Sequence, residues 1–339
     1  MNKRTIVAIC TISFALVVGV VAGLSAGPAA TFTVNSTLDA TDVNPGNGVC
    51  ETAAGNGVCT LRAAVQETNA LVGADTIVVP AGTYLITIDG VTEDNAVSGD
   101  LDITDDLIVS GAGIDSTIID GNALDRIFHI PDSASPAVEI TSLTTRNGAS
   151  FRSNIGLFEY GAGVYNGSGT LTLTSVEIDD NYGGWGGGAI YNAGTLAATN
   201  SYITNNYSIF GAGGIHNLGS GDLTMTGSSI NNNLGGGQGG GIYNLGNVTI
   251  SDSVLTGNQS ADGGGVYSSG ALTITDSTIY SNMTFGGGEG GGMYIGSGTG
   301  DLITITNSNI HDNSATWGGG LYVAAGHVVI TGSQIDSNA

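Results

Sequence analysis

Short segments in the second half of the chain alternate hydrophobic residues with β-branched polar ones. Two examples are Leu-Thr-Ile-Thr at 272–275 and Ile-Thr-Ile-Thr at 303–306, and this period of two is typical of a strand with one buried face. A glycine-rich box with an aromatic residue precedes each segment and recurs every 24 to 28 residues. A regular period in this range predicts a solenoid, in which each repeat packs on its neighbours. The positions of the aromatic residue are Tyr165, Tyr191, His216, Tyr243, Tyr267, Tyr294 and Tyr322.

Aligned repeats share apolar residues at the first, third and eighth positions of the strand segment, with Ala198 as the exception at the third position. We expect these positions to face the core. An Asn follows three residues after the eighth position, and amides stacked at the ~4.8 Å strand spacing can hydrogen-bond along the rod as a structural ladder. A column of Ser, interrupted by Val176, is expected to behave similarly. The two columns are Asn181, Asn206, Asn233, Asn258, Asn282, Asn313 and Asn338, and Ser201, Ser228, Ser253, Ser277, Ser308 and Ser333.

The glycine triplets and the length of the repeat decide between solenoid classes. Glycine costs about 1 kcal/mol in a helix, which argues against a leucine-rich repeat, and about 25 residues are too few for a four-stranded propeller blade. Parallel strands joined by successive crossovers prefer the right-handed sense. We therefore predict an all-β fold, a right-handed parallel β-helix with coils of about 25 residues over 161–339. Ala339 directly follows a ladder Asn, so we expect the array to be incomplete at this end.

The first half of the chain predicts a cap and irregular opening coils, together spanning 31–160. Thr60 can cap a single helix from Leu61 to about Val72, whose apolar residues follow three- and four-residue spacing. We expect this helix to cover the open end of the β-helix, and we expect an inserted loop at 151–160. Strands separated by Gly, Pro, Asp and Asn are predicted at 76–79, 84–88, 101–103, 107–109, 117–119, 126–130 and 138–140.

The N-terminus is typical of a secretory signal peptide, which we assign to 1–30. Lys3 and Arg4 precede an apolar run, and small residues follow it up to Ala30. The alternative is an uncleaved anchor, because residues 5–24 could nearly span a bilayer. We expect a secreted or cell-surface protein, and a monomer.

Export determines what the two remaining cysteines can do. Cys50 and Cys59 are the only cysteines outside the signal peptide. They would lie in an oxidising compartment, so we expect a disulfide between them. A metal site is disfavoured because no His or third Cys lies nearby.

Two segments after these cysteines resemble a known domain. They are Cys-Thr-Leu-Arg-Ala-Ala-Val-Gln-Glu-Thr-Asn-Ala at 59–70 and Gly-Ala-Asp-Thr-Ile-Val-Val-Pro-Ala-Gly-Thr-Tyr at 73–84. With later matches up to residue 121, they resemble the CSLREA domain of bacterial exported proteins over most of 31–148. Thr60 stands where that family has Ser, and Ala63 stands where it has Glu. The resemblance implies a right-handed parallel β-helix of the pectin-lyase-like type and a cell-surface location, and it carries no catalytic residues.

The repeats carry a second, shorter resemblance. Gly-Gly-Ala-Ile at 187–190 and the recurrent Ile-x-x-Asn are similar to the repeats of polymorphic outer-membrane adhesins. Ile stands where those proteins carry Phe. This resemblance implies an adhesive role at the cell surface.

Charge limits the partners of the exported chain. Without Lys3 and Arg4 it keeps four basic residues against 29 acidic ones, a formal charge of −25. Such a surface repels phosphates and anionic lipid, so we expect neither nucleic acid nor membrane as a partner. Cations and neutral glycans remain compatible. The simplest interpretation is a solvated acidic surface, because lysine is missing rather than acid being in excess.

Catalysis on polysaccharides is the alternative function that the fold class suggests. A lyase needs a basic group to abstract a proton, and the exported chain offers only arginines. Arg126, Arg146 and Arg152 have no matching acidic cluster that we expect on the same face. A hydrolase needs two carboxyl groups roughly 5 to 9.5 Å apart, whereas Asp179 and Asp180 should point to opposite faces of a strand. We therefore name no catalytic residue and keep polysaccharide lyase or glycoside hydrolase as the alternative.

Metal binding has one weak candidate. Six acidic residues crowd one loop and strand and could hold calcium, but their spacing fits no EF-hand, so a solvated loop is the simpler interpretation. The histidines occupy different positions in their coils, so we expect no metal site and no cofactor. The acidic residues are Glu93, Asp94, Asp100, Asp102, Asp105 and Asp106, and the histidines are His129, His216, His311 and His327.

A second column directly before the glycine triplets supplies the functional hypothesis. Its rings and polar groups suit the C–H face and hydroxyls of a sugar, whereas the aromatic column described first is more simply a structural stack. We expect Tyr160, Trp185 and Phe210 to form an outward strip, unless the rings fold back over their own turns. We expect a structural or adhesive scaffold that contacts glycans or neighbouring cells, with a polysaccharide or another cell-surface ligand as its partner. The column is Tyr160, Trp185, Phe210, Gln238, Asp262, Glu289 and Trp317.

Overall fold

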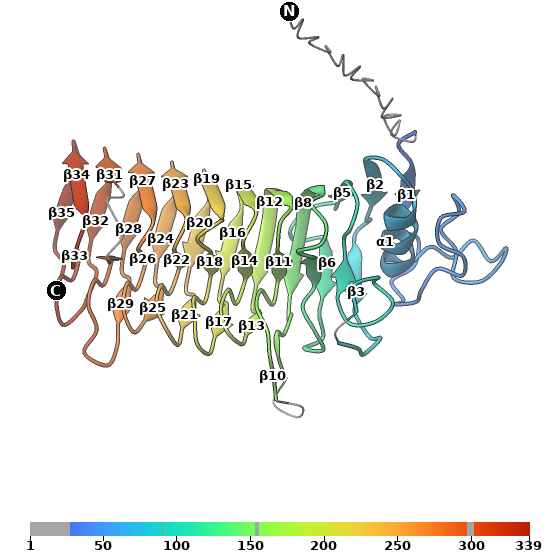
Figure 1. Cartoon of the computed structure of the whole chain (residues 1–339), viewed down its shortest axis with the longest axis horizontal. Helices are drawn as coiled ribbons and strands as arrows, with labels where there is room; N and C mark the ends of the chain where they lie inside the picture. Colours follow the sequence, from blue (N-terminus) through green and yellow to red (C-terminus); the bar gives the residue numbers. More distant parts are fainter. Residues whose placement is uncertain (1–27, 92, 153–155, 297–301) are drawn as a thin grey trace, which may run out of the picture.

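The computed structural model describes residues 28–91, 93–152, 156–296 and 302–339, so the predicted signal peptide lies almost entirely outside the described residues. The chain winds into an elongated rod in which parallel strands stack coil upon coil, with a helix at the N-terminal end (Figure 1). This confirms the predicted all-β parallel β-helix. Within the described ranges, no helix has the length and apolar character needed to cross a membrane.

The largest sheet has 19 strands arranged as two neighbouring stacks. Two strands, β8 (Ala137–Arg146) and β12 (Thr170–Asp179), are ten residues long and run across both stacks. In the coil after β12, two shorter strands take the place of one long strand, and both pair with β12. Equivalent residues pair in register along the rod. The other strands are β1 (Thr31–Thr33), β2 (Asp75–Val78), β3 (Gly82–Leu85), β5 (Leu107–Ser110), β6 (Thr117–Asp120), β15 (Thr195–Thr199), β16 (Tyr202–Thr204), β19 (Asp222–Thr226), β20 (Ser229–Asn231), β23 (Asn247–Ser251), β24 (Val254–Thr256), β27 (Ala271–Thr275), β28 (Thr278–Tyr280), β31 (Leu302–Thr306), β32 (Asn309–His311), β34 (His327–Thr331) and β35 (Gln334–Asp336).

Two further parallel sheets complete the coils. The nine-stranded sheet contains β4 (Leu101–Asp102), β7 (Phe128–Ile130), β11 (Val164–Asn166), β14 (Ile190–Asn192), β18 (Ile215–Asn217), β22 (Ile242–Asn244), β26 (Val266–Ser268), β30 (Met293–Ile295) and β33 (Leu321–Val323). The five-stranded sheet contains β13 (Tyr182–Gly183), β17 (Tyr207–Ser208), β21 (Leu234–Gly235), β25 (Gln259–Ser260) and β29 (Met283–Thr284). The segment predicted as an inserted loop forms an antiparallel hairpin of β9 (Phe151–Arg152) and β10 (Leu157–Phe158).

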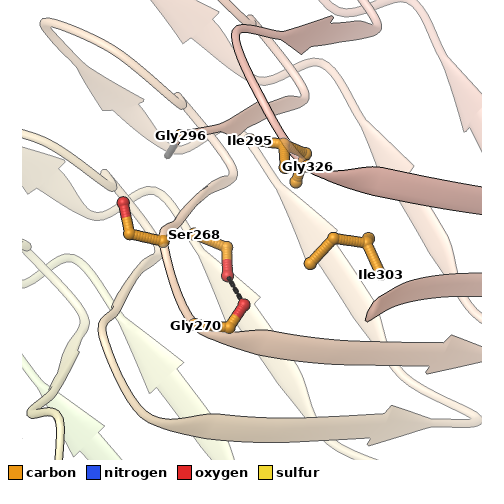
Figure 2. Close-up of a pocket in the computed structure, with 7 residues that line it drawn as sticks. Ser268, Gly270, Ile295, Gly296, Ile303 and Gly326 are labelled. Atoms are coloured by element: carbon orange, nitrogen blue, oxygen red, sulfur yellow. Dashed lines mark hydrogen bonds between the residues drawn. The ribbon is translucent and has the colours of Figure 1, made fainter. Parts of the chain in front are cut away.

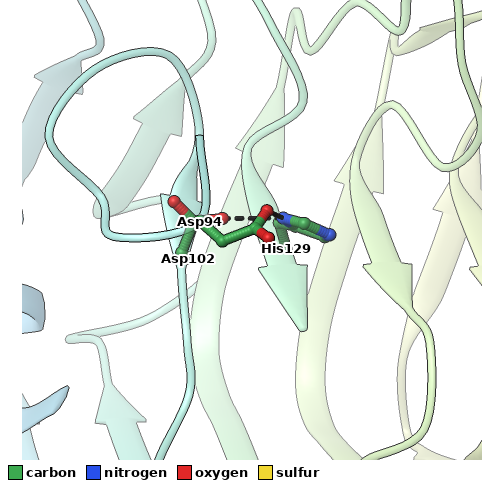
Figure 3. A group of neighbouring side chains, drawn as sticks. All are labelled: Asp94, Asp102 and His129. Atoms are coloured by element: carbon green, nitrogen blue, oxygen red, sulfur yellow. Dashed lines mark hydrogen bonds and ion pairs between the residues drawn. The ribbon is translucent and has the colours of Figure 1, made fainter. Parts of the chain in front are cut away.

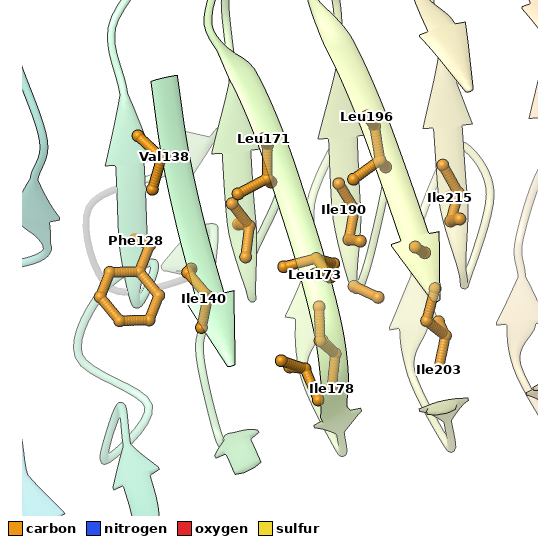
Figure 4. Packing of buried hydrophobic residues seen from close by; sticks show 14 of the residues in the cluster. Phe128, Val138, Ile140, Leu171, Leu173, Ile178, Ile190, Leu196, Ile203 and Ile215 are labelled. Carbon is orange, nitrogen blue, oxygen red and sulfur yellow. The ribbon is translucent and has the colours of Figure 1, made fainter. Parts of the chain in front are cut away.

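The predicted inward positions form the core. Leu171, Leu173 and Ile178 are buried, and equivalent side chains of neighbouring coils pack against them (Figure 4). Each such side chain contributes roughly 1.5 to 3 kcal/mol through its burial. In the last coil the equivalent Ile330 and Ile335 are exposed, which shows that a coil depends on its neighbour for burial.

Two columns of left-handed residues turn the chain at the corners of each coil. Their φ angles lie between 49° and 66°, a region that Gly, Asn and Asp enter more easily than other residues do. Each corner residue directly precedes a member of the Ser or Asn column, except Ser175, which precedes Val176, so the turn aims the following side chain inward. The columns are Ser175, Asn200, Gly227, Asp252, Asp276, Asn307 and Gly332, and Asp180, Asn205, Asn232, Gly257, Ser281, Asp312 and Ser337.

The Asn column forms a continuous ladder of hydrogen bonds from Asn181 to Asn338. Each Nδ2 donates to the Oδ1 of the next Asn at 2.9 to 3.0 Å. Asn258 is fully buried; its Nδ2 also donates to the Ile230 carbonyl, and its Oδ1 accepts from the backbone N–H of Asn233. The Ser column differs in detail, because each Ser Oγ accepts from a backbone N–H of the preceding coil.

A second amide ladder, absent from the sequence prediction, follows the aromatic column. Asn166, Asn192, Asn217 and Asn244 are linked through their side chains at 2.7 to 2.9 Å, and Asn244 donates to Ser268 Oγ. Ser268 is shorter than Asn, and its hydroxyl donates to the carbonyl of Gly270 (Figure 2). A cavity of about 10 Å³ lies beside it, which is room for about one water molecule.

The helix α1 (Leu61–Ala70) covers the N-terminal end of the rod, where it contacts β2 and β4. Thr60 caps it as predicted, because its Oγ1 accepts from the backbone N–H of Ala63 at 3.1 Å. The helix ends two residues before Val72. The predicted disulfide between Cys50 and Cys59 is confirmed, and closing this loop contributes about 2 to 3 kcal/mol to stability.

Candidate functional site

The outer face of the nine-stranded sheet carries an unbroken column of side chains along the rod. In strands such as β11, β22 and β26 the central residue points outward, because its two neighbours are buried in the core. Strand pairing holds equivalent residues in register from one coil to the next. This outer-face column consists of Asp102, His129, Tyr165, Tyr191, His216, Tyr243, Tyr267, Tyr294 and Tyr322.

Its rings form a stack from His129 to Tyr322. Consecutive ring centroids lie 4.7 to 5.4 Å apart. The rings therefore contact one another, and each pair adds about 1 kcal/mol or less beyond burial. This geometry fits a structural stack better than a row of open sugar platforms.

His216 occupies its place in the stack as a neutral ring. Burial lowers the pKa of His216 to about 4. Both ring nitrogens lack a hydrogen-bond partner among the described residues. Nδ1 lies so close to Gly186 that a Cβ there would approach it to 2.3 Å, so this glycine is required by close packing.

At the N-terminal end of the column, a buried histidine pairs with a buried aspartate. His129 Nδ1 lies 2.6 Å from Asp102 Oδ1 (Figure 3). The other oxygen of Asp102 accepts from the backbone N–H of Ala96 at 2.7 Å. Asp94 reaches over the pair from the loop above, with its Oδ1 3.7 Å from His129 Nδ1. Burial raises the pKa of Asp102, while its hydrogen bond with His129 opposes that rise.

An arginine and further acids extend this pair into a charged cluster. Arg126 donates through Nε to Asp100 at 2.7 Å, its Nη1 lies 3.7 Å from Glu159, and its guanidinium stands 5.6 Å from the Tyr165 ring centre. Burial raises the pKa of Asp100 to about 6 although Arg126 opposes it. Burial together with the charge of Asp100 raises the pKa of Asp125 to about 7. The charged cluster is Asp94, Asp100, Asp102, Asp125, Arg126, His129, Glu159 and Tyr165.

This cluster corrects two expectations from the sequence. Arg126 does have an acidic cluster on its own face, and the loop 93–106 is not simply solvated, because Asp100 and Asp102 are buried. The separations of 26 residues between Asp100 and Arg126, and of 27 between Asp102 and His129, equal one coil. That spacing is the feature of the sequence that could have predicted these contacts. The strands of this region are irregular, however, so the register between coils cannot be read from the sequence.

The other acidic residues of the loop accept hydrogen bonds from backbone N–H groups. Glu93 accepts from the N–H groups of Asn95 and Ser98, and Asp106 accepts from the N–H of Ala137. Asp105 accepts from the N–H of Asp106. The six acidic residues therefore do not converge on one calcium site.

The other three arginines in the described part of the chain are also committed to ion pairs. Arg146 pairs with Asp120 at 3.0 Å, and Arg152 pairs with Asp89. Arg62 is buried in the cap, where it pairs with Asp39 at 2.6 Å. None of them faces an open site as an unpaired base.

Asp179 and Asp180 occupy different local positions, at the end of β12 and at the corner that follows it. Asp179 Oδ1 accepts from the Thr204 hydroxyl and from Asn205 Nδ2. Asp180 is a left-handed corner residue. The two carboxylates therefore have separate roles at the edge of a sheet.

In the column before the glycine triplets, which we call the ridge, the aromatic residues are exposed and Gln238, Asp262 and Glu289 are half-buried. The ridge departs from the expected strip at one residue. Trp185, Phe210 and Trp317 are 46, 52 and 62% exposed. The rings of Trp185 and Phe210 lie 5.0 Å apart, and Phe158 of the hairpin lies 5.6 Å from both. Tyr160 instead lies against Tyr191, at 4.6 Å. Phe158 thus occupies the place predicted for Tyr160.

The polar residues of the ridge follow one another along the rod in the order predicted from the sequence. Gln238 pairs with Asp262 and Glu289 pairs with Trp317 through backbone bridges between adjacent coils. Asp262 Oδ1 accepts from the N–H of Glu289 at 3.0 Å. A hydrogen bond to Glu289 raises the pKa of Tyr322.

These features define a parallel β-helix with an exposed aromatic and polar ridge and a charged cluster near its N-terminal end. No protein-family model and no curated protein matches the chain, so neither the CSLREA resemblance nor the adhesin resemblance gains support from a family match.

Solved structures in which the chain follows a similar path include three proteins whose names describe an action on polysaccharides. A rhamnogalacturonan lyase is 11% identical, covers 91% of this chain and 87% of its own, and has a TM-score of 0.45. Pectate lyase Pel9A is 14% identical with coverages of 93% and 80% and a TM-score of 0.40. The A-module of the Azotobacter vinelandii mannuronan C-5 epimerase AlgE6 is 15% identical with coverages of 85% and 94% and a TM-score of 0.36. Likeness at this level concerns the fold alone.

Proposed function

We propose that this protein is an exported β-helix scaffold with a structural or adhesive role that binds glycans along the ridge. The observation that carries the proposal is the row of exposed rings at Trp185, Phe210 and Trp317, with hydrogen-bonding side chains between them. Contiguous exposed aromatic surface marks contact sites. The disulfide is compatible with an extracellular location.

The ridge runs along the rod axis, so it suits a linear chain. Phe210 and Trp317 are four coils apart, which is about 19 Å at the strand spacing. The exposed rings offer apolar contact to sugar C–H groups, and the oxygens of Gln238, Asp262 and Glu289 accept from hydroxyls. No Lys or Arg follows Arg152 in the sequence, so this half of the rod favours neutral over anionic glycans.

The test compares ridge variants with an exposed tyrosine on another face. Glycan-array binding and pull-down on cell-wall polysaccharides would be measured for the mature protein and for Trp185→Ala, Phe210→Ala and Trp317→Ala. We expect each ridge variant to bind about tenfold more weakly, which corresponds to ~1.4 kcal/mol. Tyr202→Ala, whose ring is 45% exposed on the 19-stranded sheet, should bind like the parent. Glycan binding that survives all three ridge substitutions would exclude the ridge as the binding surface.

Polysaccharide cleavage is the second candidate, and the Asp102–His129 pair is the observation that favours it. A carboxylate that holds one imidazole nitrogen leaves the other available for proton transfer. Reducing-end and unsaturated-product assays on any bound glycan decide between the two functions. A scaffold releases no products, whereas products that disappear with His129→Gln or Glu289→Gln would establish an enzyme.

A further inference from the structure

Three potential metal ligands meet where the outer-face column begins. His129 Nδ1, Asp102 Oδ1 and a carboxylate oxygen of Asp94 all lie within 4.8 Å of one another (Figure 3). Nδ1 is 2.6 Å from the Asp102 oxygen and 3.7 Å from the Asp94 oxygen. One imidazole nitrogen and two carboxylate oxygens form a mixed donor set that suits a transition-metal ion.

The surrounding structure holds two of these ligands and leaves the third accessible. Pairing of β4 with β7 places Asp102 beside His129, and the Ala96 N–H directs one oxygen of Asp102 away, so that the other faces the imidazole. Asp94 lies in the loop above with its side chain 61% exposed. It also lines a cavity of about 300 Å³ together with Gln66, Asn69 and Thr104. Asp94 can therefore meet an ion from solution beside the buried pair.

The local charge is unbalanced in favour of a cation. Arg126 is the only Lys or Arg in the charged cluster, and it is already paired with Asp100 and near Glu159. Among the described residues, the imidazole of His129 is the only potentially cationic side chain paired with the exposed Asp94 and the buried Asp102. Carboxylates removed from water are costly unless a positive charge compensates them.

We propose that Asp94, Asp102 and His129 bind a divalent transition-metal ion of the zinc type. Zinc bonds to such ligands at about 2.0 to 2.2 Å, so donor atoms around it lie roughly 3.3 to 3.5 Å apart. The contact between Asp94 and His129 is already close to this separation. The Asp102–His129 contact opens by less than about 1 Å to admit the ion. In this proposal the bound ion links the loop 93–98 to two adjacent coils, a site that we did not expect from the sequence.

The experiment uses metal-free mature protein, prepared with a chelator and without a polyhistidine tag. Thermal unfolding and titration calorimetry are recorded with zinc chloride and with calcium chloride. Zinc binding should raise the unfolding midpoint in proportion to RT ln(1 + [Zn]/Kd), and calcium, which prefers all-oxygen ligands, should not. Asp94→Ala, at an exposed loop position, should fold normally and bind zinc at least tenfold more weakly.

His311→Gln is the matched control. His311 Nδ1 also contacts a carboxylate, that of Asp312 at 2.7 Å, but no third ligand joins that pair among the described residues. This variant should keep the full response to zinc. Equal responses in the parent and Asp94→Ala, an equal response to calcium, or no response to zinc would each overturn the proposal. No glycan enters the measurement, so its outcome is independent of the ridge.

Discussion

The opening coils at 75–160 and the repeats at 161–339 stack the same kind of parallel strand, but they bury different polar groups. The opening coils bury charges, as in the contact between Arg126 and Asp100. The repeats bury uncharged amides in two ladders, and no Lys or Arg occurs there.

The chemistry of the side chains explains the difference. An amide is both donor and acceptor, so identical Asn residues can bond to one another through any number of coils. A carboxylate accepts only, and a guanidinium donates only. Ion pairs therefore need unlike residues at equivalent positions of adjacent coils, which breaks the repeat. The rod is regular where a residue can hydrogen-bond to an identical residue in the next coil.

The largest expected effect comes from removing the cation of the opening coils. Arg126→Met leaves Asp100, Asp125 and Glu159 without their counter-charge, and we expect a loss of about 3 to 5 kcal/mol in the free energy of unfolding. Denaturant titration measures it. Arg146→Met removes an ion pair whose arginine side chain is 39% exposed and should cost less than about 1 kcal/mol. Similar losses in both variants would show that the buried cluster is not held by its charges.

A smaller effect is expected in the ladder of the repeats. Asn258→Ala leaves Asn233, Asn282 and the Ile230 carbonyl without their partners, and we expect a loss of about 1 to 3 kcal/mol. Asn247→Ala is the control, because this exposed residue makes a side-chain bond only to Asp222 among the described residues. Thermal unfolding compares the two, and an unchanged midpoint for Asn258→Ala would mean that the ladder adds no stability.

The smallest effect is a pH dependence confined to the opening coils. The pKa of Asp125 is raised to about 7, so between about pH 4 and 7 the native state binds more protons than the unfolded chain. This contribution to stability is therefore lost as the pH rises through that window. Asp125→Asn should gain stability relative to the parent at pH 8 compared with pH 6, by about 1 kcal/mol. Asp276→Asn, at an exposed corner of the repeats, should show no such difference between the two pH values.

Much of the rod could be predicted because its determinants are local and periodic. The apolar positions, the Asn column, the cap at Thr60 and the pairing of Cys50 with Cys59 each follow from residue type and spacing alone. The second amide ladder carries the same periodic signal at Asn166, Asn192, Asn217 and Asn244, but Ser268 and Ile295 occupy its position in the next coils, so the column is short.

The direction of single side chains could not be predicted in this way. Tyr160 belongs to the ridge by spacing, yet its ring lies against Tyr191, and Phe158 from the hairpin joins Trp185 instead. Rotamer choice depends on which neighbour offers the better packing, and that neighbour comes from a hairpin outside the period.

The sequence by itself therefore determined the coil, its inward face and its uncharged ladder, since a period repeated seven times averages out local irregularity. Only the tertiary structure decided that Asp94, Asp102, Arg126 and His129 meet. In the opening coils the strands are short and the loops unequal, so sequence distance no longer reports the register. There a residue's neighbours depend on how each loop closes, and that is settled by packing and charge pairing across the whole end of the rod.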